Sequence, residues 1–197
     1  MDLEPLRLGK QVLSAPGRVT QLLDASATAH YFLQHDCAKP FPLPDASVPL
    51  VHSEHMIEHL PLAGGIAWLK EMRRLLAPGG VLRITTPDLE RYVSGYLDPE
   101  QAFYREHQQH LRDMRLEGYL GVGSIPERRT WMINQIFRYY GHLWIYDLDE
   151  LIHAATEACF PPDALQQQAF GQSLAPVLAA LDRPERRDET LYVDVSV

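Results

Sequence analysis

The sequence predicts an α/β fold with a mostly parallel sheet, on three observations. Between residues 45 and 88, two short apolar strands bracket one amphipathic helix, which is the pattern of a βαβ crossover. Short apolar strands precede this segment, at Leu6–Gly9, Val19–Asp24 and Tyr31–Gln34. The last residues, Thr190–Val197, alternate apolar and polar side chains, which is typical of an antiparallel strand.

The crossover can be divided into its elements. Its first strand is Val48–His52, and its helix is Leu62–Leu76, in which apolar residues recur at helical spacing. The turn at residues 78–80, Pro-Gly-Gly, ends the helix and leads into a second strand, Val81–Thr85. Open α/β sheets bind ligands outside the carboxyl ends of their strands. The residues that follow His52 are therefore the predicted site.

The remaining segments complete the predicted domain, which is single and spans residues 1–197. From about residue 88 to residue 142 the chain is helical and polar-aromatic in pattern, and we expect a helical cap inserted over the sheet. Asp147–Cys159 is another amphipathic helix, with Asp147 as N-cap and Glu150 three residues later. The connection between the first two strands is too short for a crossover helix, so we expect a loop or one helical turn there.

Composition excludes several classes of function. The chain is 46% hydrophobic and 22% charged, as globular proteins are. Its net charge of −8 disfavours nucleic-acid binding, which needs a basic face. No apolar run approaches the length of a membrane span, so we expect no membrane partner. The two cysteines, Cys37 and Cys159, are far apart in apolar sequence surroundings and fit reduced core thiols, which indicates a cytoplasmic protein.

Two motifs carry a resemblance to a known family. VHSEHMIEHLP at residues 51–61 and LLAPGGVLRITTPDL at residues 75–89 resemble the second half of a class I S-adenosylmethionine (SAM)-dependent methyltransferase. The chain is more narrowly similar to small bacterial predicted methyltransferases whose core reads roughly SEH-hydrophobic-LEHL and LKPGGxLRISTPDL. Further matches lie at residues 35–48, 137–147 and 189–197. The resemblance implies a Rossmann-like, mostly parallel seven-stranded sheet with a C-terminal antiparallel strand.

The resemblance also implies a set of cofactor-binding residues. Gly9 corresponds to the glycine-rich turn, and Asp24 to the acid that binds the ribose hydroxyls. Asp36 corresponds to the partner of the adenine amino group, with the backbone N–H of Cys37 beside the ring. Ser53, near the end of its strand, completes the set. Asp24 and Asp36 are also residue types that form turns, and this simpler interpretation stays open.

The first motif departs from the family pattern. The group usually shows Leu-x-x-Gly-Cys-Gly, whereas this chain has Gly9-Lys10-Gln11 after Leu6-Arg7-Leu8. A Cβ and a long side chain at Gln11 weaken cofactor binding if the backbone must approach SAM closely there. Lys10 either pairs with the methionine carboxylate of SAM or points into solvent.

The predicted site contains a cluster of possible metal ligands. His55, Glu58 and His59 are spaced i, i+3 and i+4, which places them on one helical face. Methyltransferases that modify the 3′-terminal 2′-hydroxyl of small RNAs carry a similar motif here and a later histidine. By that analogy His55, Glu58, His59 and His142 would form a divalent metal site. Many class I methyltransferases carry Glu-His-Leu there without metal, and in that case His55 is the candidate general base.

Together these patterns favour an enzyme that transfers a methyl group from SAM to an oxygen or nitrogen of a small-molecule or saccharide-like acceptor. The catalytic candidates are His55, Glu58, His59 and His142. A mostly aromatic group in the cap either lines an acceptor pocket or forms a core; its members are Trp131, Asn134, Tyr139, Tyr140 and Trp144. The alternative is a non-catalytic methyltransferase-fold protein that has lost SAM affinity and serves as a binding or regulatory partner, which Gln11 favours. The acidic composition disfavours an RNA methyltransferase.

Overall fold

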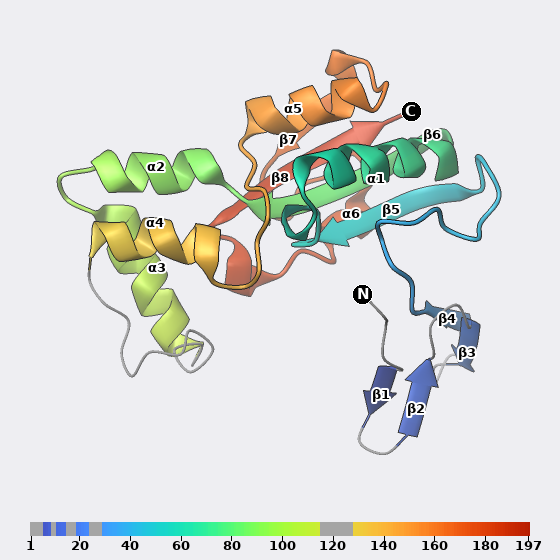
Figure 1. The fold of residues 1–197 in the computed structure, drawn as a ribbon, viewed down its shortest axis with the longest axis horizontal. Helices are drawn as coiled ribbons and strands as arrows, with labels where there is room; N and C mark the ends of the chain where they lie inside the picture. The colour runs from blue at the N-terminus through green and yellow to red at the C-terminus, as the bar shows by residue number, and fades with distance from the viewer. Residues whose placement is uncertain (1–5, 9–10, 15–18, 24–28, 115–127) are drawn as a thin grey trace. The chain divides into compact units, whose positions relative to one another are not determined.

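The computed structural model describes residues 6–8, 11–14, 19–23, 29–114 and 128–197, with side chains from residue 30 onward in these ranges (Figure 1). The chain divides into two compact units, Met1–Pro42 and Leu43–Val197. The single domain expected from chain length stays a prediction.

The first unit consists of two antiparallel strand pairs. Strand β1 (Leu6–Leu8) pairs with β2 (Gln11–Ser14), and β3 (Val19–Leu23) pairs with β4 (Ala29–Leu33). The connections within each pair are too short for a crossover of about a dozen residues, so the strands can only pair antiparallel. The expectation of a loop or helical turn between the first two predicted strands is wrong, because β2 lies there. No helix is present in the described residues of this unit.

The second unit contains a mixed four-stranded sheet, in the order β5-β6-β8-β7. Its strands are β5 (Val48–Glu54), β6 (Leu76–Pro87), β7 (Leu165–Gln168) and β8 (Thr190–Ser196). Strands β5 and β6 are parallel, and the other two pairings are antiparallel. The predicted crossover and C-terminal antiparallel strand are therefore confirmed. The turn predicted at residues 78–80 is wrong, because these residues lie within β6, where its register with β5 shifts. The mostly parallel seven-stranded sheet is wrong for the described residues, where only one helix joins two parallel strands.

Two long helices lie side by side on one face of this sheet (Figure 1). Helix α1 (Leu62–Leu75) is the crossover helix, and its residues Trp68, Leu69 and Met72 are buried. Helix α5 (Leu148–Glu157) begins as predicted at Asp147, whose carboxylate accepts a hydrogen bond of 2.9 Å from the Glu150 backbone N–H. The short elements are η1 (Ile57–His59), η3 (Pro162–Ala164), α6 (Pro176–Ala179) and η4 (Pro184–Arg186).

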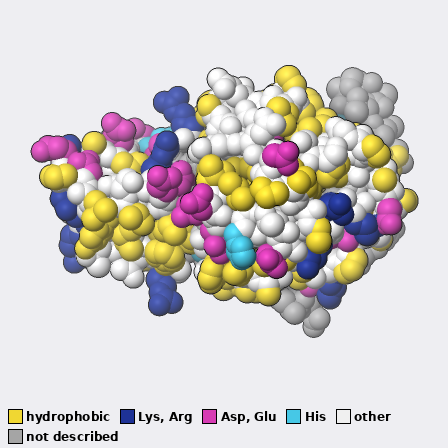
Figure 2. Space-filling view, turned by 90° about the horizontal axis from the view of Figure 1, so that it is seen from above, with side chains coloured by type: hydrophobic (Ala, Val, Ile, Leu, Met, Phe, Trp, Pro, Cys, Tyr) yellow, Lys and Arg dark blue, Asp and Glu magenta, His cyan; other side chains and the backbone are white. Residues whose placement is uncertain are grey.

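The segment predicted as a cap contains α2 (Leu89–Leu97), α3 (Ala102–Asp113) and α4 (Arg129–Arg138). These helices share a core of their own, formed by Tyr92, Tyr104, Leu111, Trp131, Met132, Ile136 and Ile145. Trp131, one of the aromatic residues expected to line a pocket or form a core, therefore belongs to a core. Figure 2 shows hydrophobic side chains on one face of the cap. Val93 and Leu97 of α2 are exposed.

Gly95 sets how closely α2 and α3 approach each other. A Cβ atom at this position would lie 2.7 Å from the ring of Phe103 and 3.0 Å from that of Tyr104. Replacing Gly95 by alanine is expected to destabilise the protein by about 1–3 kcal/mol through overpacking, although alanine is the better helix former. Urea unfolding measures this, with Ser94→Ala on the exposed side of the same turn as control. A Gly95→Ala protein as stable as Ser94→Ala would contradict the packing.

Two predictions from composition have different outcomes. Cys159 is exposed at the end of α5, in a left-handed conformation with φ of +68°, so its assignment as a core thiol is wrong. Cys37 is partly buried, and burial raises the pKa of its thiol. Among the helices that the structure describes, none is long and apolar enough to cross a membrane.

Candidate functional site

The predicted site forms where β5 ends. His55 follows the strand directly, and its backbone N–H donates a 2.9 Å hydrogen bond to the carbonyl of Thr85 on β6. The residue has a φ of +43°, a left-handed conformation that costs a non-glycine residue free energy. The chain then turns through η1, a single 3-10 turn, and not through a longer α-helix. His55 thus precedes the turn that carries Glu58 and His59.

Hydrogen bonds occupy both ring nitrogens of His55. Arg186 donates to Nδ1 at 3.0 Å, so Nε2 carries the proton and donates to the hydroxyl of Thr190 at 2.9 Å. That hydroxyl donates in turn to the Arg186 carbonyl at 2.6 Å. Burial, and then the positive charge of Arg186, lowers the pKa of His55 to about 2. The geometry therefore makes His55 a neutral residue whose basic nitrogen is already bound.

Glu58 is fully buried next to this network. Its Oε2 accepts a 3.1 Å hydrogen bond from the Thr86 hydroxyl, while Oε1 has no hydrogen-bond partner among the described residues. Burial raises the pKa of its carboxyl group to about 7. The backbone carbonyl of Glu58 accepts hydrogen bonds from the N–H groups of Leu143 and Trp144, which fixes the segment after α4 against η1.

That backbone contact brings His142 to His59. Their rings meet edge to face, with centroids 5.0 Å apart. Nδ1 of His142 lies 2.6 Å from the carbonyl oxygen of Ile136; because a carbonyl only accepts, Nδ1 is the donor and Nε2 keeps its lone pair. Burial lowers the pKa of His142. Three atoms that could bind a metal ion lie within 4.8 Å of one another: a carboxylate oxygen of Glu58 and one ring nitrogen each of His59 and His142.

These groups line a pocket of about 350 Å³ between the sheet edge and the cap. All four catalytic candidates contribute to it. So does Tyr140, one of the aromatic residues expected to line a pocket or form a core. The sequence reasoning missed other lining residues, from the cap and from the segment before β8: Tyr92, Ile136, Arg186 and Glu189. For Glu189, the only signal in the sequence was that it begins the last string that matches the family, ETLYVDVSV.

The predicted cofactor-binding residues have varied outcomes. Gly9 and Asp24 lie outside the described residues. Asp36 accepts a 3.1 Å hydrogen bond from the Ala38 N–H, and this bond, above all, lowers the pKa of its carboxyl group, as in a turn. Cys37 follows it. Ser53 is buried within β5, and its hydroxyl has no hydrogen-bond partner among the described residues. The roles of these residues stay predictions.

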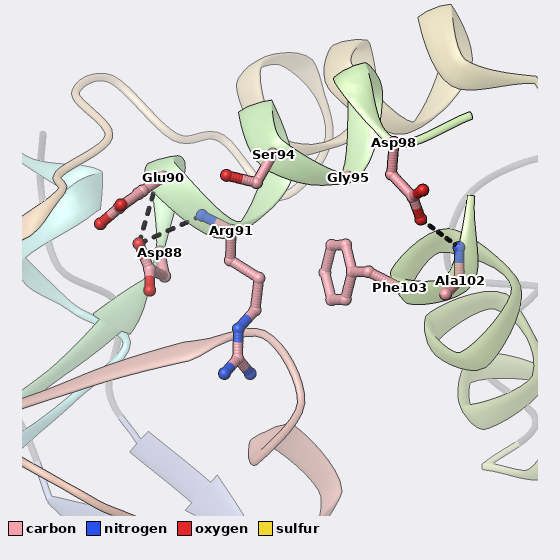
Figure 3. A pocket seen from close by; sticks show the side chains of 8 residues that line it. All are labelled: Asp88, Glu90, Arg91, Ser94, Gly95, Asp98, Ala102 and Phe103. Atoms are coloured by element: carbon pink, nitrogen blue, oxygen red, sulfur yellow. Dashed lines mark hydrogen bonds between the residues drawn. The ribbon is translucent and has the colours of Figure 1, made fainter. Parts of the chain in front are cut away.

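A second hollow of about 450 Å³ lies between α2 and α3 (Figure 3). Asp88 and Asp98 both line it, but their carboxylates serve the backbone. Asp88 accepts from the N–H of Glu90 at 3.1 Å, and Asp98 accepts from the N–H of Ala102 at 2.8 Å. These acids therefore cap the two helices. The pocket beside β5 is the stronger candidate for a functional site, because its carboxylate and imidazole groups do not cap helices.

A comparison with known protein families agrees with the resemblance that the motifs at residues 51–61 and 75–89 carry. Residues 12–84 match the family model described as the methyltransferase domain, which confirms the resemblance over this part of the chain. No curated protein matches the chain.

Several solved structures are similar to the chain. They include a SAM-dependent methyltransferase from Thermotoga maritima, at 14% identity and a TM-score of 0.44, covering 84% of this chain and 63% of that one. Another is a SAM-dependent methyltransferase from Archaeoglobus fulgidus, at 13% identity and a TM-score of 0.40, covering 79% and 62%. The chain thus spans less than two thirds of the length of either structure.

Proposed function

We propose that this protein transfers a methyl group from SAM to an oxygen or nitrogen of a small-molecule or saccharide-like acceptor, and that the acceptor binds in the pocket beside β5. The observation that carries the proposal is the position of this pocket. It lies at the carboxyl end of the parallel pair β5 and β6, in a chain whose residues 12–84 match the methyltransferase domain. Ligands bind at this edge in open α/β sheets.

The chemistry requires little more than correct placement of two reactants. Methyl transfer is an in-line displacement, so holding donor and acceptor in line supplies much of the rate. A base is needed when the nucleophile is a hydroxyl. Since the basic nitrogen of His55 is bound by Arg186, this histidine is better suited to holding the pocket wall than to taking a proton. The remaining pocket groups that can accept that proton are Glu58, His59, His142 and Glu189.

The pocket also fits a divalent metal ion held by Glu58, His59 and His142. Oε1 of Glu58 is a buried oxygen without a partner, and such an atom needs an explanation. The Nδ1–H of His142 is bound to a backbone carbonyl, which is how metal-binding histidines are usually oriented. His55 drops out of the predicted ligand set, because both of its nitrogens are engaged. A bound ion would supply a Lewis acid for the acceptor hydroxyl.

Metal binding can be measured without any activity. We expect one Zn²⁺ or Co²⁺ ion to bind per chain in calorimetric titration, and Co²⁺ to give visible absorption bands. His142→Ala should lower the affinity about 10- to 100-fold or more, as a lost ligand does. His153→Ala, an exposed histidine on α5, is the control and should bind like wild type. Equal binding by the two variants, or none by wild type, would exclude this metal site.

Cofactor binding tests the assignments in the first unit. Asp24→Ala should weaken SAM binding about 10- to 100-fold, because hydrogen bonds to a charged group contribute about 1.5–3 kcal/mol. Gln11→Gly should strengthen binding if the backbone approaches SAM at that position. Calorimetric titration measures both, with Asp163→Ala, an exposed acid on η3, as control. Unchanged affinity in Asp24→Ala would remove the ribose assignment.

One observation favours the non-catalytic alternative. Gln11 replaces a family glycine and begins strand β2, and the described part of the first unit holds strands without a helix. A methyltransferase-fold protein without SAM affinity would keep the pocket as a binding site only. The two functions differ in SAM binding by the wild-type chain, which the enzyme requires and the alternative excludes.

A further inference from the structure

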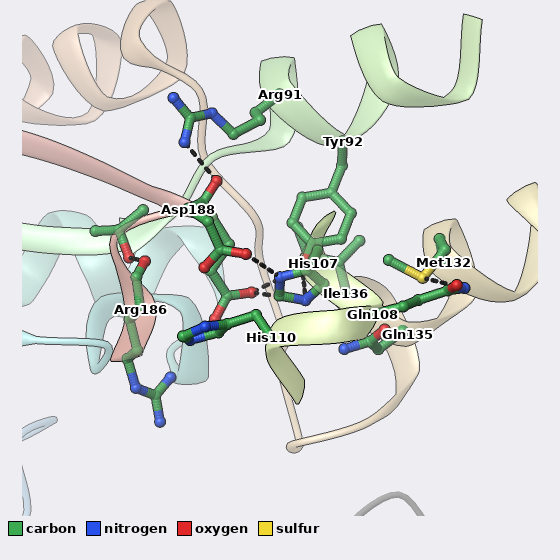
Figure 4. A network of polar contacts seen from close by, with 12 residues as sticks. Arg91, Tyr92, His107, Gln108, His110, Met132, Gln135, Ile136, Arg186 and Asp188 are labelled. Atoms are coloured by element: carbon green, nitrogen blue, oxygen red, sulfur yellow. Dashed lines mark hydrogen bonds and ion pairs between the residues drawn. The ribbon is translucent and has the colours of Figure 1, made fainter. Parts of the chain in front are cut away.

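A buried chain of hydrogen bonds ends at the pocket (Figure 4). At its centre is His107 on α3, which is 1% exposed. Its Nδ1 lies 2.7 Å from a carboxylate oxygen of Asp188, and its Nε2 lies 3.1 Å from the hydroxyl of Tyr92. That hydroxyl donates a 2.7 Å hydrogen bond to Oε2 of Glu189, which lines the pocket. The chain thus runs Asp188–His107–Tyr92–Glu189.

The direction of these bonds determines the charge of His107. Tyr92 has one hydroxyl proton and donates it to Glu189, so Nε2 of His107 must be the donor in its own bond to Tyr92. Nδ1 must also donate, because a carboxylate only accepts. His107 is therefore an imidazolium. Burial alone lowers the pKa of this histidine, but the hydrogen bond and charge of Asp188 and the charge of Glu189 outweigh it and raise the pKa.

The surrounding groups hold this arrangement in place. Arg91 on α2 donates to the backbone carbonyl of Asp188, and His110 on α3 binds a backbone carbonyl of η4. The ring of Phe103 stacks on His107, with centroids 5.6 Å apart and an interplanar angle of 26°. An aromatic face over a cation is favourable. The cap helices and the segment before β8 are thereby joined at the imidazolium.

We propose that Glu189 is the residue that takes the proton from the methyl acceptor, and that His107 and Tyr92 are positioning residues that hold its carboxylate toward the pocket. This inference rests on the proposed function. Oε2 of Glu189 is bound to Tyr92, which leaves Oε1 to receive the proton. Glu58 is less suited because it is fully buried, whereas the Glu189 side chain is 15% exposed.

The proposed step balances in atoms and charge. The acceptor hydroxyl oxygen forms a bond to the methyl carbon of SAM while the bond from that carbon to the sulfonium sulfur breaks. The hydroxyl proton passes to Oε1 of Glu189. The products are the methylated acceptor, neutral S-adenosylhomocysteine and a protonated Glu189, which returns its proton to water.

The series of hydrogen bonds from Asp188 to Glu189 is tested by NMR of the 197-residue protein with ¹⁵N-labelled histidine, which needs no ligand. We expect both ring nitrogens of His107, assigned with His107→Gln, to be protonated at pH 7. Tyr92→Phe should lower the pH at which His107 loses its proton, because the Nε2–H loses its acceptor. Tyr104→Phe is the control, since it removes another buried hydroxyl, one bound to the Tyr92 backbone carbonyl. A neutral His107 at pH 7 would contradict the series of hydrogen bonds from Asp188 to Glu189. So would equal shifts, in the two variants, of the pH at which His107 loses its proton.

The role of Glu189 is tested by transfer of tritium from [methyl-³H]SAM to a panel of monosaccharides, phenols and amines. Glu189→Gln should lower kcat about 100-fold or more and leave SAM affinity unchanged, as loss of a general base does. Tyr92→Phe should cause a smaller loss of kcat and shift the pH profile. A kcat for Glu189→Gln near that of wild type would overturn the base assignment. A wild-type protein that fails to bind SAM would remove the proposed function and, with it, the role of Glu189 as base. The NMR experiment would still show whether the hydrogen bonds from Asp188 to Glu189 exist.

Discussion

Replacing Arg83 by methionine is expected to destabilise the protein by about 3–5 kcal/mol, as breaking a buried ion network does. Arg83 lies in the middle of β6 with none of its surface exposed. Its guanidinium group binds both carboxylate oxygens of Asp182 at 2.7 Å and one oxygen of Asp194 at 2.8 Å. Methionine would leave two buried carboxylates without their cation.

These two carboxylates also hold the segment between β7 and β8. Asp182 accepts a hydrogen bond from the N–H of Gly171, and Asp194 accepts one from the N–H of Leu174. Replacing Arg83 should therefore destabilise the segment between β7 and β8 as well as the sheet. Urea unfolding measures the free energy of unfolding, and Arg74→Met is the control. The Arg74 side chain is 30% exposed in its ion pairs with Asp45 and Glu71, so its loss should matter much less than that of the fully buried Arg83. Equal losses in the two variants would contradict the network's importance.

Replacing Glu58 by glutamine is expected to stabilise the metal-free protein at pH 8 and to change it little at pH 4. Burial raises the pKa of Glu58 to about 7 in the folded state, from 4.5. As the pH rises from 4.5 to 7, the unfolded chain releases this proton before the folded one does, so the wild-type protein loses stability. Each pH unit of that window contributes about 1.4 kcal/mol, which gives about 3 kcal/mol in total.

The measurement is urea unfolding of both proteins at pH 4 and pH 8 with a chelator present. His55, which is neutral in both folded proteins, contributes equally to each and cancels in the difference. Glu157→Gln, at an exposed position of α5, is the control and should show no such dependence on pH. A difference between Glu58→Gln and wild type that stays constant from pH 4 to pH 8 would show that Glu58 titrates like an exposed carboxyl group.

The crossover from β5 to β6 could be predicted because its information is local. The helical spacing of apolar residues specifies α1 within a few residues, and the capping acid Asp147 does the same for the start of α5. The Pro-Gly-Gly sequence at residues 78–80 predicts a turn wrongly, because β6 includes these residues. Strands β1, β3 and β4 of the first unit could be located, but not β2. The pairing of these strands could not be predicted either, because it depends on connection lengths and partners. Strand β7 reads Leu-Gln-Gln-Gln, and such a polar edge strand has no hydrophobic alternation to reveal it.

The candidate site was predictable in its first half only. The rule that ligands bind at the carboxyl ends of strands places His55, Glu58 and His59 correctly at the pocket. Arg186 and Glu189 come from a segment that is distant in sequence, and only the fold brings them to the pocket. His107 lies behind the pocket and is connected to it through Tyr92. The role of His55 illustrates the same limit, because a sequence shows an imidazole but not the guanidinium group that occupies its basic nitrogen.

Calorimetric titration of the 197-residue wild-type chain with SAM and with S-adenosylhomocysteine decides whether this protein binds the methyl donor. We expect saturable binding of one molecule of either ligand per chain. Absence of binding by both, up to millimolar concentration, would contradict a methyltransferase and favour a binding protein that has kept the fold and lost the cofactor.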